Sequence, residues 1–395
     1  MHKRYLLKGF ITTLIILGVS GIIYLYTAGY RLEKNKNEIP IDFTVTGMIN
    51  AKSIPEGATV YLNDEIKTAT NSSIGGIAPG IYNLKIVKSG FTPWEKNIEV
   101  FPELVTDITA VLVSKTPRIE PLTQTGATNP AISPTLSTIA YFSQDDKNPG
   151  VWTLPLNPAR LNIFSATPSV VLEDTTYTKF SQGLNIFWSP DEKQLLIQQD
   201  ENSYYLAELG TRTAKTVTNW LEIKEGWDLA LTEKRSALLE KLDISEELKE
   251  LALHKETIWS PDGKKFLYKI ENQNGQNEYR VYNMENPLPV GENVDTLVLT
   301  TEKYLGNEQE ATAIAPKFSW YADSFHLIVL QREMNETDNR GQVSLIRIDG
   351  TNRTEIYNNK IYSDNIFSSP NGDKIILLTS FRTTDQIDLY TVSVR

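Results

Sequence analysis

One long apolar stretch opens the chain, segments that alternate apolar and polar residues follow it, and short apolar segments between polar turns continue almost to the end. The stretch covers residues 9–30, which carry no charge over 22 positions. As a helix it would measure about 33 Å, enough to cross a hydrocarbon core of about 30 Å. Lys3, Arg4 and Lys8 precede it, which favours a cytoplasmic N-terminus. We therefore expect residues 1–30 to form an uncleaved transmembrane anchor. The alternative is a cleaved signal peptide, whose apolar core is usually only about 7–15 residues long.

A small β-domain is predicted directly after the anchor. Residues 31–42 are polar and are expected to be a linker. Period-two alternation, which half-buried strands require, then begins. It predicts a compact antiparallel β-domain over residues 43–114, with no helical pattern. The expected strands cover residues 44–47, 59–63, 81–87, 97–100 and 108–113.

The first turn of this domain carries a recognisable motif. Residues 53–61 read SIPEGATVY, and they resemble the signature of the PEGA domain. The segments 78–82 and 88–91 agree with that resemblance, whereas Ser72-Ser73 departs from the Thr-Pro that is usual there. The resemblance implies a β-sandwich of surface-layer and envelope proteins that serves as a spacer or interaction module without catalytic residues. Residues 55–58 also suit a plain turn, since Pro fixes φ and Gly permits a positive φ. We expect this motif to be a turn rather than a binding element.

Five similar units fill residues 116–395. Each begins with a turn that contains a serine, followed by an apolar strand, a polar hairpin and a second strand. The five serines are Ser133, Ser189, Ser260, Ser319 and Ser369. A weaker outer strand follows in four units, and four short strands per unit are typical of a propeller blade. The fifth unit lacks its outer strand, whereas residues 118–123 precede the first unit without a sheet of their own. We expect this segment to complete the fifth blade and close the ring, which protects the sheet edges. An open or six-bladed ring is the alternative.

The turns also resemble a known repeat. Ser260-Pro261-Asp262-Gly263, followed by an aliphatic strand, resembles the TolB-like propeller repeats of envelope proteins, although the other turns match less fully. The resemblance implies a scaffold for protein–protein contact, sometimes fused to peptidases, in a prokaryote.

The third unit is delayed by an insertion at residues 229–254. We expect two short helices there, over residues 229–242 and 245–254, because leucines recur three or four positions apart on each. Asp243 with Glu246 resembles a capping box. The helices are expected to pack against the propeller, and a partner-docking arm is the alternative.

Composition excludes several classes of site. The chain has 395 residues, no cysteine, three histidines and a formal charge of −10. The absence of cysteine excludes disulfides, thiolate metal sites and a cysteine nucleophile. An acidic balance argues against nucleic-acid binding, which needs a basic surface. No G-x-S-x-G motif or phosphate-binding glycine loop is present.

The remaining polar and aromatic candidates are expected to be structural. Asp191, Asp262 and Asp323 recur in different turns and should cap them rather than converge, and the acidic hairpin 145–148 lacks the spacing of a calcium loop. Trp188, Trp259 and Phe367 are expected to fill the space between blades, with glycan or peptide binding as the alternative. His254 and His326 are expected to be isolated. We therefore predict no catalytic residue, no metal ligand and no cofactor.

These observations predict a membrane-anchored, single-pass envelope protein whose bulk lies outside the cytoplasm. Its propeller would be a non-catalytic scaffold that binds a protein or cell-wall polymer. The alternative is an envelope enzyme, such as a glycan lyase or hydrolase, whose site in the propeller channel would show convergent acids or histidines. A third possibility is a sensor that faces the cytoplasm.

Overall fold

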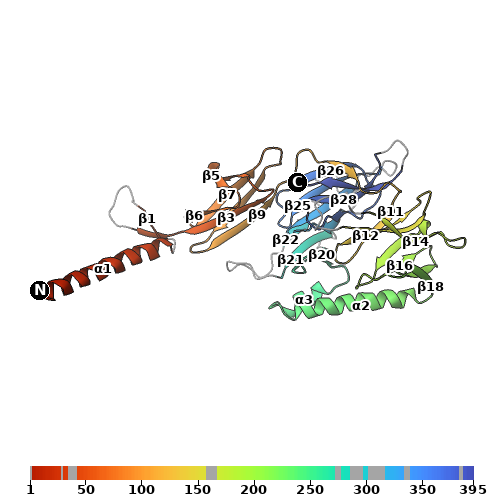
Figure 1. Ribbon diagram of the computed structural model, residues 1–395, viewed down its shortest axis with the longest axis horizontal. Coiled ribbons are helices and arrows are strands. Elements are labelled where there is room, and N and C mark those ends of the chain that lie inside the picture. Colours follow the sequence, from red (N-terminus) through yellow and green to blue (C-terminus); the bar gives the residue numbers. More distant parts are fainter. Residues whose placement is uncertain are drawn as a thin grey trace. The chain divides into compact units, whose positions relative to one another are not determined.

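The computed structural model (Figure 1) describes residues 2–27, 30–33, 42–156, 167–271, 277–284, 297–300, 316–332, 339–381 and 386–395. The chain divides into two compact units, with the boundary between Leu112 and Val113.

The first unit begins with the helix α1 (His2–Thr27). Its described side chains, from Gly9 to Tyr24, are exposed. Among the residues that the structure describes, no helix combines the length and the apolar character needed to cross a membrane. The anchor therefore stays a prediction.

The ends of the expected linker form strands. The strand β1 (Tyr30–Glu33) pairs antiparallel with β2 (Asp42–Val45), in the register Tyr30↔Val45. The linker predicted for residues 31–42 was wrong at both ends, because pairing satisfies backbone N–H and C=O groups that a free polar segment would leave to water. The stretch between these strands lies outside the described residues.

A two-sheet sandwich follows, as the PEGA resemblance implied. One sheet has the order β6 (Ser72–Ile77), β3 (Gly47–Ile54), β9 (Val105–Val111). The other has the order β5 (Glu65–Ala69), β4 (Thr59–Leu62), β7 (Gly80–Val87), β8 (Trp94–Val100). Ile49, Leu84 and Trp94 belong to the buried core between them. The prediction of a wholly antiparallel domain was wrong, since β3 and β9 run parallel. The intervening chain is long enough for the crossover that a parallel pair requires.

The turn at residues 55–58 has the geometry expected of a turn. Gly57 adopts a φ of +73°, which favours glycine. The backbone N–H of Ala58 donates to Thr70 Oγ1 at 2.9 Å, and the Ala58 side chain is buried. Its small size therefore suits the turn, without any need for a binding role.

The second unit contains five four-stranded antiparallel sheets, here called blades 1 to 5. Blade 1 comprises β11 (Thr128–Ile132), β12 (Thr138–Ser143), β13 (Gly150–Pro155) and β14 (Ser169–Glu173). Blade 2 comprises β15 (Asn185–Trp188), β16 (Gln194–Gln198), β17 (Tyr204–Glu208) and β18 (Thr213–Val217). Blade 3 comprises β19 (Ile258–Trp259), β20 (Lys265–Glu271), β21 (Asn277–Asn283) and β22 (Leu297–Thr300). Blade 4 comprises β23 (Lys317–Trp320), β24 (His326–Arg332), β25 (Arg340–Arg347) and β26 (Thr354–Lys360). Blade 5 comprises β27 (Phe367–Ser368), β28 (Lys374–Thr379), β29 (Asp388–Ser393) and β10 (Ile119–Pro121). A short 3-10 helix, η2 (Phe180–Gln182), precedes blade 2.

The predicted ring closure is confirmed. The strand β10 pairs antiparallel with β29, in the register Ile119↔Val392, although more than 250 residues separate them. An ion pair of 2.9 Å between Lys374 Nζ and Glu120 Oε2 joins β10 to β28. Blades 1 and 5 share a buried cluster that includes Tyr141 and Ile376. Five blades and a closing strand from upstream therefore describe this unit.

One member of the predicted serine series is misplaced. In four turns the serine N–H donates to the carbonyl five residues later, as Ser189 does to Gln194 O at 3.0 Å. In blade 4 that bond runs from Tyr321 N to His326 O at 3.1 Å, so Tyr321 takes the serine's place rather than Ser319. Tyr321 is buried, and its hydroxyl donates to Gly372 O in blade 5. A large aromatic ring thus replaces the small residue that the repeat predicted.

The insertion between blades 2 and 3 starts earlier than predicted. The helix α2 (Trp220–Leu239) begins nine residues before the expected Leu229 and is followed by α3 (Glu246–Ala252). Stacking of the Trp220 ring on Tyr204 of blade 2, at a centroid distance of 4.2 Å, holds the additional turns in place. The boundaries predicted for the insertion, 229–254, were therefore wrong at the start.

The capping box predicted from Asp243 and Glu246 was also wrong. Ser245 is the N-cap of α3, and its side chain accepts from Leu248 N at 3.3 Å. The prediction that the helices pack on the propeller is confirmed, since Leu239 and Leu248 share a buried cluster with Phe266 of blade 3.

Candidate functional site

A cavity of about 660 Å³ lies at the centre of the five blades. The first strand of every blade contributes to its wall, namely β11, β15, β19, β23 and β27. Because these strands surround the same space, the cavity is the channel of the propeller. Its volume is in the range that binds small ligands, roughly 300–1,000 Å³.

One face of α2 supplies the rest of the wall. The contributing residues recur at intervals of three or four and so share one side of the helix. They are Lys224, Trp227, Asp228, Leu231, Lys234, Arg235 and Leu238. In Figure 1 α2 (green) runs from β18 toward α3 along the edge of blades 2 and 3. The helix therefore borders the channel rather than standing free of the propeller.

Three tryptophans in the wall are held by hydrogen bonds. Trp188 Nε1 donates to Ala131 O of blade 1 at 3.1 Å, and Trp320 Nε1 donates to Ile258 O of blade 3 at 2.8 Å. Each of these bonds joins neighbouring blades. Trp259 Nε1 instead donates to an α3 carbonyl, that of Ala252, at 2.8 Å.

Two of the three aromatic residues predicted to fill the space between blades do so. Trp188, Trp259 and Phe367 are partly buried, and each packs against a hydrophobic cluster. All three also line the channel, so they present ring surface to it. The prediction is confirmed for Trp188, between blades 1 and 2, and for Phe367, between blades 1 and 5. It was wrong for Trp259, which packs between blade 3 and the inserted helices.

Two of the three cations on the channel face of α2 lie against aromatic rings. Lys224 Nζ is 5.6 Å from the centroid of the Phe187 ring, and Arg235 Cζ is 5.3 Å from that of Trp259. Burial lowers the pKa of the Arg235 guanidinium, an effect that the negative charge of Asp228 partly opposes. The second acid in the wall, Asp364, is paired with Arg332 Nε at 2.7 Å.

The three turn aspartates predicted to be caps are caps. Asp191 Oδ1 accepts from Ser189 Oγ at 2.8 Å, and Asp262 Oδ1 accepts from Ser260 Oγ at 2.6 Å. Asp323 Oδ1 accepts from the backbone N–H of the two residues that follow Ser324, at 2.8 and 3.0 Å. Each aspartate serves its own turn.

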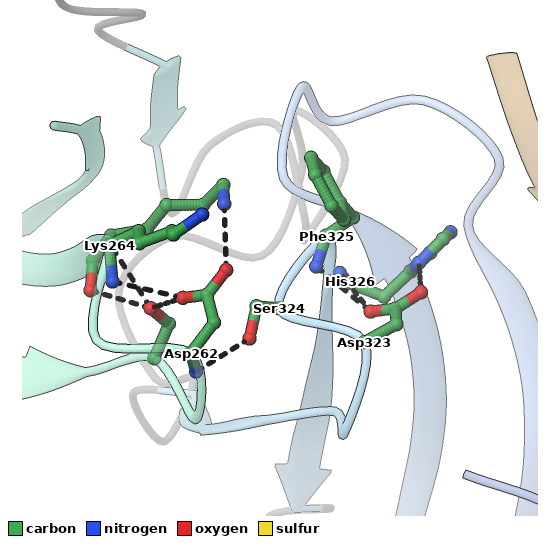
Figure 2. Close-up of polar contacts among 8 residues, drawn as sticks. Asp262, Lys264, Asp323, Ser324, Phe325 and His326 are labelled. Atoms are coloured by element: carbon green, nitrogen blue, oxygen red, sulfur yellow. Dashed lines mark hydrogen bonds and ion pairs between the residues drawn. The ribbon is translucent and has the colours of Figure 1, made fainter. Parts of the chain in front are cut away.

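Two of these turns are joined, as Figure 2 shows. Asp262 N donates to Ser324 Oγ of blade 4 at 3.1 Å, and Asp262 Oδ2 accepts from Lys265 Nζ at 3.0 Å. Lys265 is fully buried, with its ammonium 4.2 Å from the centroid of the Phe325 ring. Burial alone would raise the pKa of Asp262, but hydrogen bonds from Ser260, Lys264 N–H and Lys265 outweigh it and lower that pKa.

A buried aspartate–histidine pair adjoins this junction. His326 Nδ1 lies 2.7 Å from Asp323 Oδ2, and His326 is 2% exposed. Burial would raise the pKa of Asp323, yet the bonds from His326 and from backbone N–H groups lower it overall. The prediction that His326 is isolated was wrong, because β24 brings its ring onto the turn that precedes the strand. Neither residue lines the channel.

The remaining acidic candidate is also a turn. Asp145 Oδ2 accepts from Lys147 N at 3.2 Å and from Asn148 N at 3.0 Å. Within the described residues, no group of three or more histidine, aspartate or glutamate side chains could hold a metal. The described channel wall carries two carboxylates, Asp228 and Asp364, and no histidine. Aromatic rings and cationic side chains line the same described wall.

Comparison with known proteins identifies the first domain. The PEGA domain family matches residues 46–116. Residues 46–116 are a PEGA domain. Its sandwich is the one formed by β3–β9, and the PEGA tetrapeptide is the turn that contains Gly57. No curated protein sequence matches the chain.

Solved structures similar to the chain include TolB proteins. The crystal structure of TolB from Acinetobacter baumannii is 18% identical with a TM-score of 0.26, over 79% of this chain and 59% of that one. A protein assigned as TolB from Agrobacterium tumefaciens is 12% identical with a TM-score of 0.26, over 86% and 99%. An oligogalacturonate lyase from Vibrio parahaemolyticus is 9% identical with a TM-score of 0.31, over 80% and 84%. The chain thus spans less than two thirds of the length of the first of these proteins.

Proposed function

We propose that this protein is a membrane-anchored binding protein of the cell envelope, with no catalytic role, whose propeller recognises its partner in the central channel. The observation that carries this proposal is the channel wall itself, to which all five blades and one face of α2 contribute. Side chains from six separate elements meet there, and concave sites of this kind are where proteins hold ligands.

The state of the acidic residues supports binding over acid–base catalysis. A glycan hydrolase or lyase in the channel would use acids poised to exchange protons. Of the two acids in the described channel wall, Asp364 is instead engaged with Arg332, and Asp228 interacts electrostatically with Arg235. Both acids thus face a cation, and the donors and ring surfaces around them suit recognition.

The binding test compares two leucines on α2. Leu231 lines the channel, whereas Leu229 is 60% exposed and does not. We expect Leu231→Trp to block the channel and Leu229→Trp to leave it open. The full chain and both variants would be used to capture components from envelope extracts, with circular dichroism to verify folding. A component bound by the parent and Leu229→Trp but lost from Leu231→Trp is expected. The same recovered set from the parent and Leu231→Trp, an empty set included, would contradict the proposal.

The anchor and its orientation rest on the uncharged stretch 9–30 and the preceding cations. After alkaline carbonate extraction, the full chain should stay with the membranes, and a chain that lacks residues 1–40 should be released. Protease added to intact cells should digest the large domain if it lies outside the cytoplasm. Release of the full chain by carbonate would contradict the anchor, and protection from protease would favour the cytoplasmic sensor.

A further inference from the structure

The face of α2 that borders the channel is rich in side-chain hydrogen-bond donors that meet no acceptor among the described residues. Lys224, Trp227, Lys234 and Arg235 all carry N–H groups and line the cavity. Within the described chain, none of these N–H groups meets a hydrogen-bond acceptor, in contrast to the indoles of Trp188, Trp259 and Trp320. The single acceptor side chain on this face is Asp228. A ligand that fits such a face must therefore be rich in acceptors.

The net charge of this face is positive, whereas that of the whole protein is negative. The chain carries a net charge of −10, yet the face has three cations and one carboxylate. Arg332 compensates the other acid in the wall, Asp364. A local positive site in an acidic protein attracts an anion and holds it by charge-assisted hydrogen bonds. Charge complementarity thus indicates an anionic group on the ligand.

Ring surfaces complete the wall. Trp227 projects from the middle of the α2 face, between Lys224 and Arg235, and Trp259 lies beneath the guanidinium of Arg235. Indole faces pack well against flat apolar surfaces, including the C–H face of a sugar ring. The ligand therefore combines an anionic group with a flat, partly apolar body.

We propose that the channel binds an acidic saccharide, a sugar ring that carries a carboxylate or phosphate group, with the anion held by Lys224 and Arg235 and the ring against Trp227. This inference rests on the proposed function, because it names the ligand class of the same channel. Sugar hydroxyls and ring oxygens supply acceptors for the unused donors. An acidic peptide suits the face less well, because its backbone N–H groups would find only Asp228 as an acceptor there.

The test uses the full chain in detergent and ligands that share one ring. Glucuronate and glucose 6-phosphate would be compared with glucose by tryptophan fluorescence and saturation-transfer NMR, which also distinguishes a carboxylate from a phosphate preference. We expect at least one charged sugar to bind about tenfold or more tightly than glucose. Lys224→Gln and Arg235→Gln should each weaken that binding about tenfold. The matched control, Lys241→Gln, removes an exposed lysine outside the cavity and should change nothing.

Several outcomes would overturn the inference. If glucose bound as tightly as the charged sugars, the ligand would need no anionic group. If triglutamate bound more tightly than the sugars, the site would be assigned to acidic peptides. An equal loss in Lys241→Gln would mean that the charge effect is non-specific. If no sugar binds while Leu231→Trp still abolishes envelope capture, the saccharide is wrong and the proposed function stands.

Discussion

Removing one buried hydroxyl tests how the propeller ring is held closed. Thr123 lies just after β10 and is 2% exposed. Its Oγ1 donates to Asp388 Oδ1 at 2.9 Å and accepts from Leu389 N at 3.0 Å. Thr123→Val keeps the branched shape and removes both bonds, although Gly126 N still donates to Asp388 at 3.0 Å.

The magnitude follows from burial at both ends of the bridge. Asp388 and Leu389 are 0% exposed, so water cannot replace the lost partner without opening the structure. Each buried polar group left without a partner costs about 1–3 kcal/mol. Leu389 N–H loses its partner whereas Asp388 keeps the bond from Gly126 N, so Thr123→Val is expected to lower the unfolding free energy of the propeller by about 1–3 kcal/mol.

The assay is urea unfolding of the full chain, followed by tryptophan fluorescence, because six of the seven tryptophans lie after residue 113. Hydrogen exchange of β10 and β29 amides should also become faster. Thr216→Val, at an exposed position on β18, is the control and should stay within about 0.5 kcal/mol of the parent. A Thr123→Val protein as stable as this control would refute the reasoning that the hydroxyl bridge secures the ring.

Two further substitutions test the blade junctions. Asp323→Asn removes the charge paired with buried His326 and should lower stability near neutral pH by about 1–3 kcal/mol. Because the folded state lowers the pKa of Asp323 below its ordinary 3.8, the ionised form stabilises the protein above that pH. This contribution is lost as pH falls through the folded pKa. The difference in unfolding free energy between the parent and Asp323→Asn should therefore shrink when urea unfolding is repeated at decreasing pH. Gly183→Ala would place a Cβ 2.4 Å from the Phe142 ring and should cost about 1–3 kcal/mol in urea unfolding.

Each substitution has a matched control. Asp191→Asn alters the equivalent turn of blade 2, where the carboxylate is exposed, and should have a smaller effect. Gly210→Ala meets no atom within 4 Å and should leave stability nearly unchanged. A pH-independent penalty for Asp323→Asn, or equal effects of the two glycine variants, would contradict these explanations.

Strand-level organisation was accessible from the sequence because it is local. Alternation marked strands of the first domain, since a half-buried strand requires a period of two, and a serine-containing turn followed by an apolar strand marked each blade. Counting strands also placed β10 in blade 5. The fifth unit had only three strands of its own, and the segment before the first unit had no sheet to join. The PEGA motif was equally local, because the positive φ of Gly57 is needed for the turn that contains it.

The start of α2 was within reach of the sequence but was missed. Trp220, Ile223, Trp227 and Leu231 follow one another at intervals of three or four, which is a helical pattern. Gly226 and the neighbouring charges obscured it, and the contact that stabilises these turns is with Tyr204, on another element.

What only the tertiary structure decided depends on contacts between distant segments. Tyr321 replaced the expected serine because its hydroxyl reaches Gly372 in the next blade, and His326 gained Asp323 through the path of the turn. The channel wall came from six elements, none of which carries a binding motif by itself. The sequence by itself determined which backbone segments pair, because pairing depends on local pattern. Only the packed structure decided which side chains face one cavity, because that depends on where separate strands and a helix meet in space.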